Sequence, residues 1–250
     1  MLDLQIKDGI AWITLQRPAA LNAINQEMAQ SFLTHIKELE QRQDVRAVLT
    51  RGEGRAFCAG SDLRELAPMP AEQAAKCELG FAQIFSALDR LPQPKIAVLH
   101  GHVLGGGLGL ALYHDFRIAS QTANLAMPEV ELGWTPPWAM GRLADVVGFQ
   151  KARWILLTCG TMTGLEASRI GLVDEAVPED QLLARAQQLA TRLASMPEEG
   201  IARTKKLLNL MSPLRRSEWD AAAAEAFREC YEKPEAQQKV ADFLNKKKQR

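Results

Sequence analysis

The sequence lacks both an excess of charge and any long apolar run. Its 250 residues carry 30 Lys and Arg and 30 Asp and Glu side chains, so the formal net charge at pH 7 is zero. A balanced chain offers no basic surplus to nucleic acid or to an anionic membrane. No apolar stretch reaches the ~20 residues that span a bilayer. The N-terminus shows no basic segment followed by an apolar one, as a secretory signal would. We therefore expect a cytoplasmic protein without a nucleic-acid or membrane partner.

Cysteine is also scarce. The chain has four, Cys58, Cys77, Cys159 and Cys230, and no two of them form a CxxC pair. This spacing predicts reduced thiols in a cytosolic protein and offers no metal site. Cys58 lies inside a motif but has no histidine beside it, so we expect a small buried residue rather than a nucleophile.

Strand and helix patterns alternate along most of the chain. An Asp8-Gly9 turn predicts a β-hairpin over 4–15. Asn25 is a candidate N-cap for a helix with one apolar stripe, and a second helix near 71–90 is expected to face Leu79, Ile84 and Leu88 inward. Further strands are predicted at 45–50, 96–99, 116–119, 123–126 and 173–177, and further helices at 179–195, 199–211, 214–232 and 234–247. This alternation predicts an α/β fold, spiral or layered, with a core at 1–195 and a helical region at 196–250.

A glycine-rich stretch at 101–109 lies between the predicted strand 96–99 and a predicted helix over 110–113. Glycine lets a ligand approach the main chain closely. The first N–H groups of a helix are unpaired and carry the positive end of its dipole. Such a junction binds a phosphate or a developing oxyanion; tight packing of the backbone against a neighbouring helix is the alternative.

Two further segments carry candidate chemistry. In Ala59-Gly60-Ser61-Asp62 another glycine precedes a helix, with Asp62 as its expected N-cap. The two glycine loops together could form an oxyanion hole. Glu129 follows Pro128 among apolar residues. If buried, it would have a raised pKa and could take and return a proton; if solvated, it would be an ordinary loop carboxylate.

Four segments, at 17–24, 56–63, 100–107 and 127–129, resemble the enoyl-CoA hydratase/isomerase (crotonase) family in order and spacing, and the resemblance covers essentially the whole chain. It implies a crotonase-like spiral of ββα units with a helical C-terminal region that serves oligomerisation and part of the CoA site. It also implies a homotrimer or a dimer of trimers. The substrate would be an acyl-CoA thioester, with CoA as part of the substrate and no separate cofactor.

The resemblance also assigns roles to residues. The main-chain N–H groups of Ser61 and Gly106 would hold the thioester oxygen, and Glu129 would be the base. Arg64 matches a basic position near the CoA phosphates, while Phe243 and Lys246 match positions of the last helix that reach CoA. The remaining candidates around the substrate are Ala23, Ala59, Asp62, Leu63, Gly105, Gly109, Trp134 and Trp138; for the two tryptophans, core packing is a compatible alternative.

Gly109 departs from the pattern of family hydratases, which carry a first glutamate at this position and a second where Glu129 stands. The stretch 133–138 also lacks the glycine-rich turn typical of hydratases. Family isomerases commonly keep only the second glutamate, so the sequence favours a double-bond shift in an enoyl-CoA. An atypical hydratase, another lyase or hydrolase on the same oxyanion hole, and a CoA-ester-binding protein without turnover are the alternatives. Glu131 is a second carboxylate, which would share a face with Glu129 in an extended segment and point away from it in a helical turn; we expect it to have a structural role. His100, His102 and His114 lie near the glycine loop, where we expect structural roles.

Overall fold

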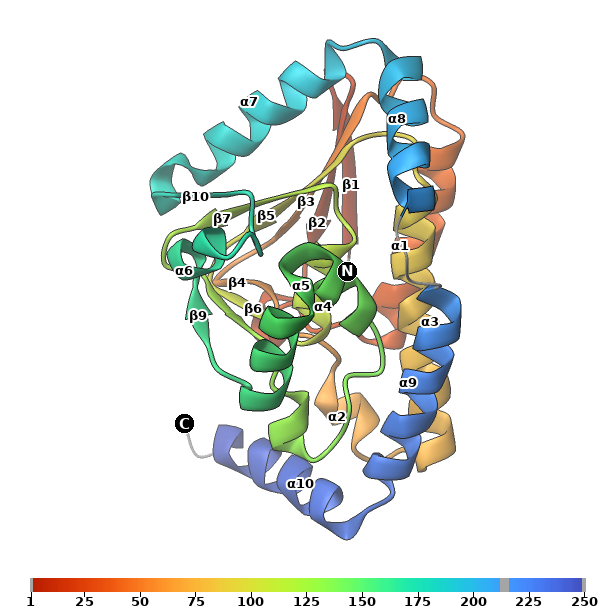
Figure 1. Ribbon diagram of the computed structural model, residues 1–250, viewed down its shortest axis with the longest axis vertical. Coiled ribbons are helices and arrows are strands. Elements are labelled where there is room, and N and C mark those ends of the chain that lie inside the picture. The colour runs from red at the N-terminus through yellow and green to blue at the C-terminus, as the bar shows by residue number, and fades with distance from the viewer. Residues whose placement is uncertain (1, 212–215, 249–250) are drawn as a thin grey trace.

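A computed structural model describes residues 2–211 and 216–248. It contains two β-sheets (Figure 1). The larger sheet has the order β1-β2-β3-β5-β7-β10; β1 and β2 pair antiparallel and the other neighbours pair parallel. Its strands are β1 (Leu2–Lys7), β2 (Ile10–Leu15), β3 (Ala47–Gly52), β5 (Lys95–Leu99), β7 (Phe116–Ser120) and β10 (Glu175–Val177). The smaller sheet joins β4 (Ala56–Cys58), β6 (His102–Leu104), β8 (Asn124–Ala126) and β9 (Met162–Thr163) in chain order.

The chain alternates between the two sheets. β3, β5 and β7 of the larger sheet are followed at once by β4, β6 and β8 of the smaller one, and a helical segment then precedes the next pair. The helices of this part are α1 (Gln26–Glu40), α2 (Leu63–Leu66), α3 (Ala71–Arg90), α4 (Gly106–Leu112), α5 (Met140–Thr158), α6 (Gly164–Arg169) and α7 (Leu182–Ala194), with 3₁₀ turns η1 (Pro18–Ala20), η2 (Glu129–Leu132) and η3 (Glu179–Gln181). This is the predicted α/β spiral of ββα units.

Local sequence signals account for several of these elements. Asp8 and Gly9 both have positive φ, 52° and 74°, as the tight hairpin between β1 and β2 requires. The side chain of Asn25 accepts from the Met28 N–H and caps α1. Thr163 and Glu166 form a reciprocal capping box at α6. The predictions of the hairpin and of the Asn25 cap are confirmed.

The main core lies between the two sheets and their helices, whereas α7 covers the other face of the larger sheet. Residues Leu182, Ala186 and Ala190 of α7 pack on the apolar side chains Ile10, Leu49, Ile96 and Ile118. In Figure 1, α7 crosses the strands of the larger sheet on the side away from α4 and α5. Of the helices in 2–211 and 216–248, none is long and apolar enough to cross a membrane.

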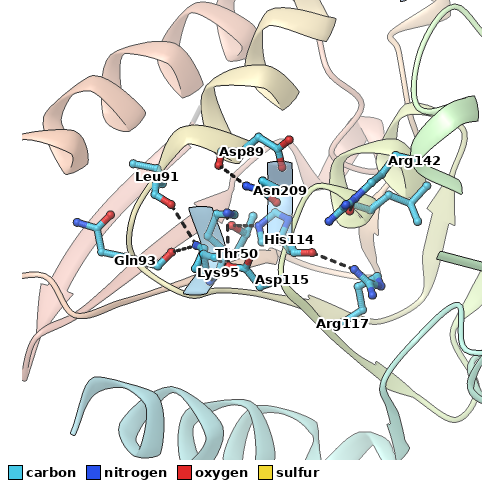
Figure 2. Close-up of polar contacts among 12 residues, drawn as sticks. Thr50, Asp89, Leu91, Gln93, Lys95, His114, Asp115, Arg117, Arg142 and Asn209 are labelled. Carbon is cyan, nitrogen blue, oxygen red and sulfur yellow. Dashed lines mark hydrogen bonds and ion pairs between the residues drawn. The ribbon is translucent and has the colours of Figure 1, made fainter. Parts of the chain in front are cut away.

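The C-terminal part folds back on the core as three helices, α8 (Glu198–Met211), α9 (Arg216–Tyr231) and α10 (Pro234–Lys248). They follow the predicted ranges; residues 214 and 215 of the predicted helix 214–232 lie outside the described residues. α9 packs along α3, and α10 packs against α2 and η2 (Figure 1). α8 is tied to the core by Lys205, which hydrogen-bonds the Leu91 and Gln93 carbonyls and pairs with Asp115. Figure 2 shows these three partners of Lys205 lying near one another.

Two sequence predictions need correction. The glycine stretch is not a loop up to residue 109, because His102–Leu104 forms strand β6 and α4 begins at Gly106. In α3, Leu79 is 38% exposed and Glu78 is buried in its place. Ile84 and Leu88 are buried as predicted, and the buried face of α3, which packs against α1 and α9, also includes Glu78, Phe81 and Phe85.

Candidate active site

The first glycine loop follows β4 and is held by a single backbone pairing. The Ile24 N–H donates to the Gly60 carbonyl at 2.7 Å, and the Asp62 N–H donates to the Ile24 carbonyl at 2.8 Å. Because successive residues of an extended segment direct their polar groups to opposite sides, this pairing turns the Ser61 N–H away from Ile24. The Asp62 side chain then caps α2 by accepting from the Arg64 N–H at 3.2 Å, as predicted.

The second glycine loop lies directly against the first. A Cβ atom on Gly60 would stand 3.0 Å from the Gly106 nitrogen, so no larger side chain fits between the loops. Gly106 is the first residue of α4, and its N–H therefore has no acceptor within the helix. Gly105, just before it, has a φ of 49° and is anchored by its N–H to the Ala126 carbonyl at 2.9 Å. The structure thus brings the loops that carry the Ser61 and Gly106 amides against each other.

Glu129 lies beside this junction and is buried. It begins η2 and is 5% exposed. Its Oε1 atom would be 2.7 Å from a Cβ atom on Gly105, so only glycine at 105 leaves room for the carboxylate. Its buried Oε2 atom has no hydrogen-bond partner in the described part of the chain. Burial is the main reason that the pKa of Glu129 rises to about 8, and the charge of Glu78 raises it further. The buried alternative for Glu129 is therefore the one observed.

Trp138 fills the space beside Gly109. Carbon atoms of its indole ring would be 3.0 Å from a Cβ atom on Gly109 and 3.1 Å from one on Gly106. The ring also meets Phe85 edge-on, with a centroid distance of 5.7 Å. A carboxylate side chain at 109 would collide with this indole, so the lack of one agrees with the surrounding packing.

Glu78 is the site residue that sequence reasoning missed. Its side chain, from α3, is 2% exposed and accepts a hydrogen bond from the Trp138 Nε1 atom at 2.5 Å. Burial raises the pKa of Glu78 to about 7, although hydrogen bonds from Trp138 and Ser61 lower it. A signal was available in the sequence: Glu78 lies three residues before Phe81 and seven before Phe85, which places it on the same side of the helix as these two apolar residues.

The other candidates are placed as follows. Glu131 is exposed on the 3₁₀ turn, which directs it away from Glu129. Trp134 packs with Phe227 and Tyr231 of α9, whereas Trp138 contacts the glycine loop.

Cys58 is buried, as predicted, and burial raises its pKa to about 12. Arg64 on α2 and Phe243 and Lys246 on α10 are exposed, Ala23 is buried, and Ala59 and Leu63 are half-buried.

The histidines near the glycine loop have backbone or side-chain partners. His100 contacts the Gly54 carbonyl at 2.9 Å, and His102 contacts the Asn124 side chain at 3.5 Å. His114 is buried against Thr50, and burial lowers its pKa to about 3. In residues 2–211 and 216–248, no three His, Cys, Asp or Glu side chains gather as metal ligands would.

Comparison with known proteins bears directly on this site. A sequence model described as enoyl-CoA hydratase/isomerase matches residues 5–250. The chain belongs to this family. It is 33% identical to a short-chain-enoyl-CoA hydratase of Clostridium acetobutylicum over 245 aligned residues, and the alignment covers 97% of this chain and 94% of that protein. It is 29% identical over 249 residues to a crotonyl-CoA hydratase of Syntrophomonas wolfei, with 98% and 95% covered.

Solved structures agree with the family fold. An enoyl-CoA hydratase from Mycobacterium avium subsp. paratuberculosis superposes with a TM-score of 0.88 at 25% identity, covering 96% of this chain and 97% of that one. One from Bacillus anthracis gives 0.83 at 26% identity, with 98% and 96% covered. The chain is therefore an enzyme of the enoyl-CoA hydratase/isomerase family. The names of these relatives say hydratase, whereas Gly109 and Trp138 leave no carboxylate at position 109.

Proposed function

We propose that this enzyme shifts the double bond of an enoyl-CoA from position 3 to position 2, with Glu129 as its single base. The observation that carries the proposal is Glu129 itself, a buried carboxylate beside the junction of the two glycine loops. The thioester oxygen of the substrate accepts from the Ser61 and Gly106 N–H groups. Each such donor contributes roughly 3 kcal/mol when negative charge develops on that oxygen.

The reaction needs one proton and one base. Glu129 removes a proton from C2, and the electron pair moves through the thioester carbonyl onto its oxygen. The dienolate then takes the same proton from Glu129 at C4, so the double bond lies between C2 and C3 and Glu129 is ionised again. A base with a pKa of about 8 is well matched to this work, because it holds the transferred proton at neutral pH yet can release it.

The remaining family features are proposed on similar grounds. Arg64, Phe243 and Lys246 bind the CoA moiety; α10, which carries the last two, packs beside α2 and η2. CoA enters as part of the substrate, and no separate cofactor is required. The protein acts in the cytoplasm as a homotrimer or a dimer of trimers, with 196–250 contributing to assembly. Supporting assembly, α5 exposes three large apolar side chains, Phe149, Trp154 and Leu157.

Hydration of a 2-enoyl-CoA is the second candidate. The names of the relatives favour it, and Glu78 supplies a second buried carboxylate near Glu129. Assaying 3-enoyl-CoA isomerisation and crotonyl-CoA hydration separately distinguishes the two. We expect isomerisation to be the faster reaction. Fast hydration without isomerisation would favour the second candidate, and binding of CoA esters without turnover would favour a binding protein.

The role of Glu129 is tested by Glu129→Gln, which keeps the shape of the side chain and removes the base. We expect turnover to fall by about 10²–10⁴-fold, the range for a general base. Glu131→Gln is the matched control, because that side chain is exposed on the same turn. We expect the control to retain full activity. Unchanged turnover in Glu129→Gln would contradict the single-base proposal.

A further inference from the structure

Glu78 combines features that packing alone does not explain. It is a carboxylate at 2% exposure, and no lysine, arginine or histidine of the described chain forms an ion pair with it. A buried carboxylate without a counter-charge costs several kcal/mol, whereas a neutral side chain at the same position would avoid that cost. It accepts a hydrogen bond from Trp138 Nε1 at 2.5 Å, and its interaction with the Ser61 side chain lowers its pKa.

Ser61 belongs to the first glycine loop, whereas Trp138 lies outside both loops and packs against the second. Ser61 carries one of the two amides that face the junction. Trp138 lies against the first turn of α4, with its ring 3.1 Å from a Cβ position on Gly106, the residue that carries the other amide. One carboxylate on α3 therefore connects the two halves of the proposed oxyanion hole.

The charge of Glu78 also reaches the base. It raises the pKa of Glu129, although burial is the larger cause. The other titratable groups that its charge affects are Cys77, its neighbour on α3, and Tyr231 of α9; in both, burial is the larger cause of a raised pKa. The surroundings of Glu78 are thus neutral or acidic on every packed side for which an interaction is known.

We propose that Glu78 is a positioning residue that holds the Ser61 and Gly106 amides in register, through its hydrogen bond with Trp138 and its interaction with the Ser61 side chain, and places a negative charge within reach of Glu129. This inference rests on the proposed function, because it assigns Glu78 to the same oxyanion hole and base. It explains why α3 directs a carboxylate rather than Leu79 inward. It also gives Trp138 a role besides packing, since the indole transmits the position of Glu78 to α4.

A first experiment observes the Trp138 indole without any assay. In ¹⁵N-tryptophan-labelled protein, the Trp138 Nε1–H resonance is assigned by its loss in Trp138→Phe. We expect this resonance to shift with pH, with a midpoint near neutrality, as the Glu78 side chain ionises. The reason is that a carboxylate is a stronger hydrogen-bond acceptor than a carboxylic acid. The shift should disappear in Glu78→Gln and persist in Glu72→Gln, an exposed glutamate on the same helix. A Trp138 resonance without any titration would overturn the proposal, whether or not the proposed function is correct.

A second experiment measures the pH dependence of turnover. Glu78→Gln can still accept from Trp138 but has no charge, so the acid limb of kcat/KM, set by Glu129, should move to lower pH by about one unit. Glu78→Met can accept neither hydrogen bond. We expect its kcat to fall about tenfold or more with KM changed about twofold or less, and Glu78→Gln to restore most of that loss.

The two proposals fail in different ways. If Glu78→Gln were as inactive as Glu129→Gln at every pH, Glu78 would be transferring protons itself, and the positioning role would be wrong. If Glu78→Met had wild-type kcat, the link between the loops would be unnecessary. If Glu129→Gln were fully active, the proposed function would fail, while the indole titration would still report on Glu78.

Discussion

Two carboxylates of this molecule, the half-buried Asp115 and the buried Glu129, have opposite surroundings. Asp115 immediately precedes β7 and accepts from the Lys95 N–H, at the start of β5, at 2.7 Å. Its carboxylate pairs with the ammonium group of Lys95 at 3.4 Å (Figure 2) and with that of Lys205 at 2.7 Å. Burial alone would raise the pKa of Asp115, but the two lysines lower it. Glu129 has no such cation, and its pKa is raised.

The comparison distinguishes a carboxylate whose cationic partners stabilise the fold from a buried carboxylate that is left available for proton transfer. Around Asp115, neighbouring polar groups also have partners: the Lys205 ammonium contacts two carbonyls, and His114 bridges the Leu110 carbonyl and the Thr50 hydroxyl. Such a cluster holds α8 and β5 together. At Glu129, one oxygen lacks a partner among the described residues. That absence costs stability and leaves the oxygen free to take a proton.

The largest expected effect on folding comes from breaking the Asp115 cluster. Asp115→Asn keeps the shape but leaves two buried ammonium groups without a counter-charge. We expect the free energy of unfolding, measured in urea at pH 7, to fall by about 3–5 kcal/mol. The kcat/KM of the molecules that stay folded should be unchanged. Asp44→Asn, at an exposed ion pair with Arg42, should change stability far less, because solvent screens an exposed pair. A similarly small loss in Asp115→Asn would mean that the cluster does not stabilise the fold.

Removing the charge of Glu129 should raise the free energy of unfolding, the opposite of the effect expected at Asp115. The pKa rises from 4.5 to about 8 on folding, so between these pH values the folded state binds more protons than the unfolded state, and stability falls as pH increases. At ~1.4 kcal/mol per pH unit, the ceiling is about 5 kcal/mol, and we expect about half of it after relaxation. Glu129→Gln should therefore be more stable than wild type at pH 9 by about 2–3 kcal/mol, with little difference at pH 4.

The control for that measurement is Glu131→Gln, whose exposed side chain should alter stability little at either pH. Parallel unfolding curves for wild type and Glu129→Gln from pH 4 to pH 9 would show that Glu129 is not buried as a reactive acid. Loss of stability in Glu129→Gln at pH 9 would show that the carboxylate has a partner after all.

Much of the fold was predictable because its signals are local. The Asp8-Gly9 hairpin, the Asn25 cap and the Thr163 capping box depend on a few neighbouring residues, and the structure contains each of them. The start of α4 was not predictable in the same way. Gly106 has poor helix propensity, and its helical conformation is imposed by contacts with Gly60 and Trp138.

The site residues that lie in contiguous sequence motifs were predictable, whereas Glu78, which lies outside them, was not. The two loops and Glu129 come from contiguous motifs, and the structure brings them together. The burial of Glu129 had remained open, since it depends on Gly105 leaving room for the carboxylate. Glu78 belongs to no motif. Its inward orientation follows from how α1 and α9 pack on α3, which is a property of residues far apart in the chain.

The most direct test of the central claim is the pH dependence of kcat/KM for the wild-type enzyme with a 3-enoyl-CoA. This profile reports the pKa of the base in the free enzyme. If burial without a counter-charge prepares Glu129 for proton transfer, activity rises with pH to a plateau, with a midpoint near the pKa of about 8 given by its surroundings. A midpoint near the ordinary glutamate value of 4.5 would contradict the account.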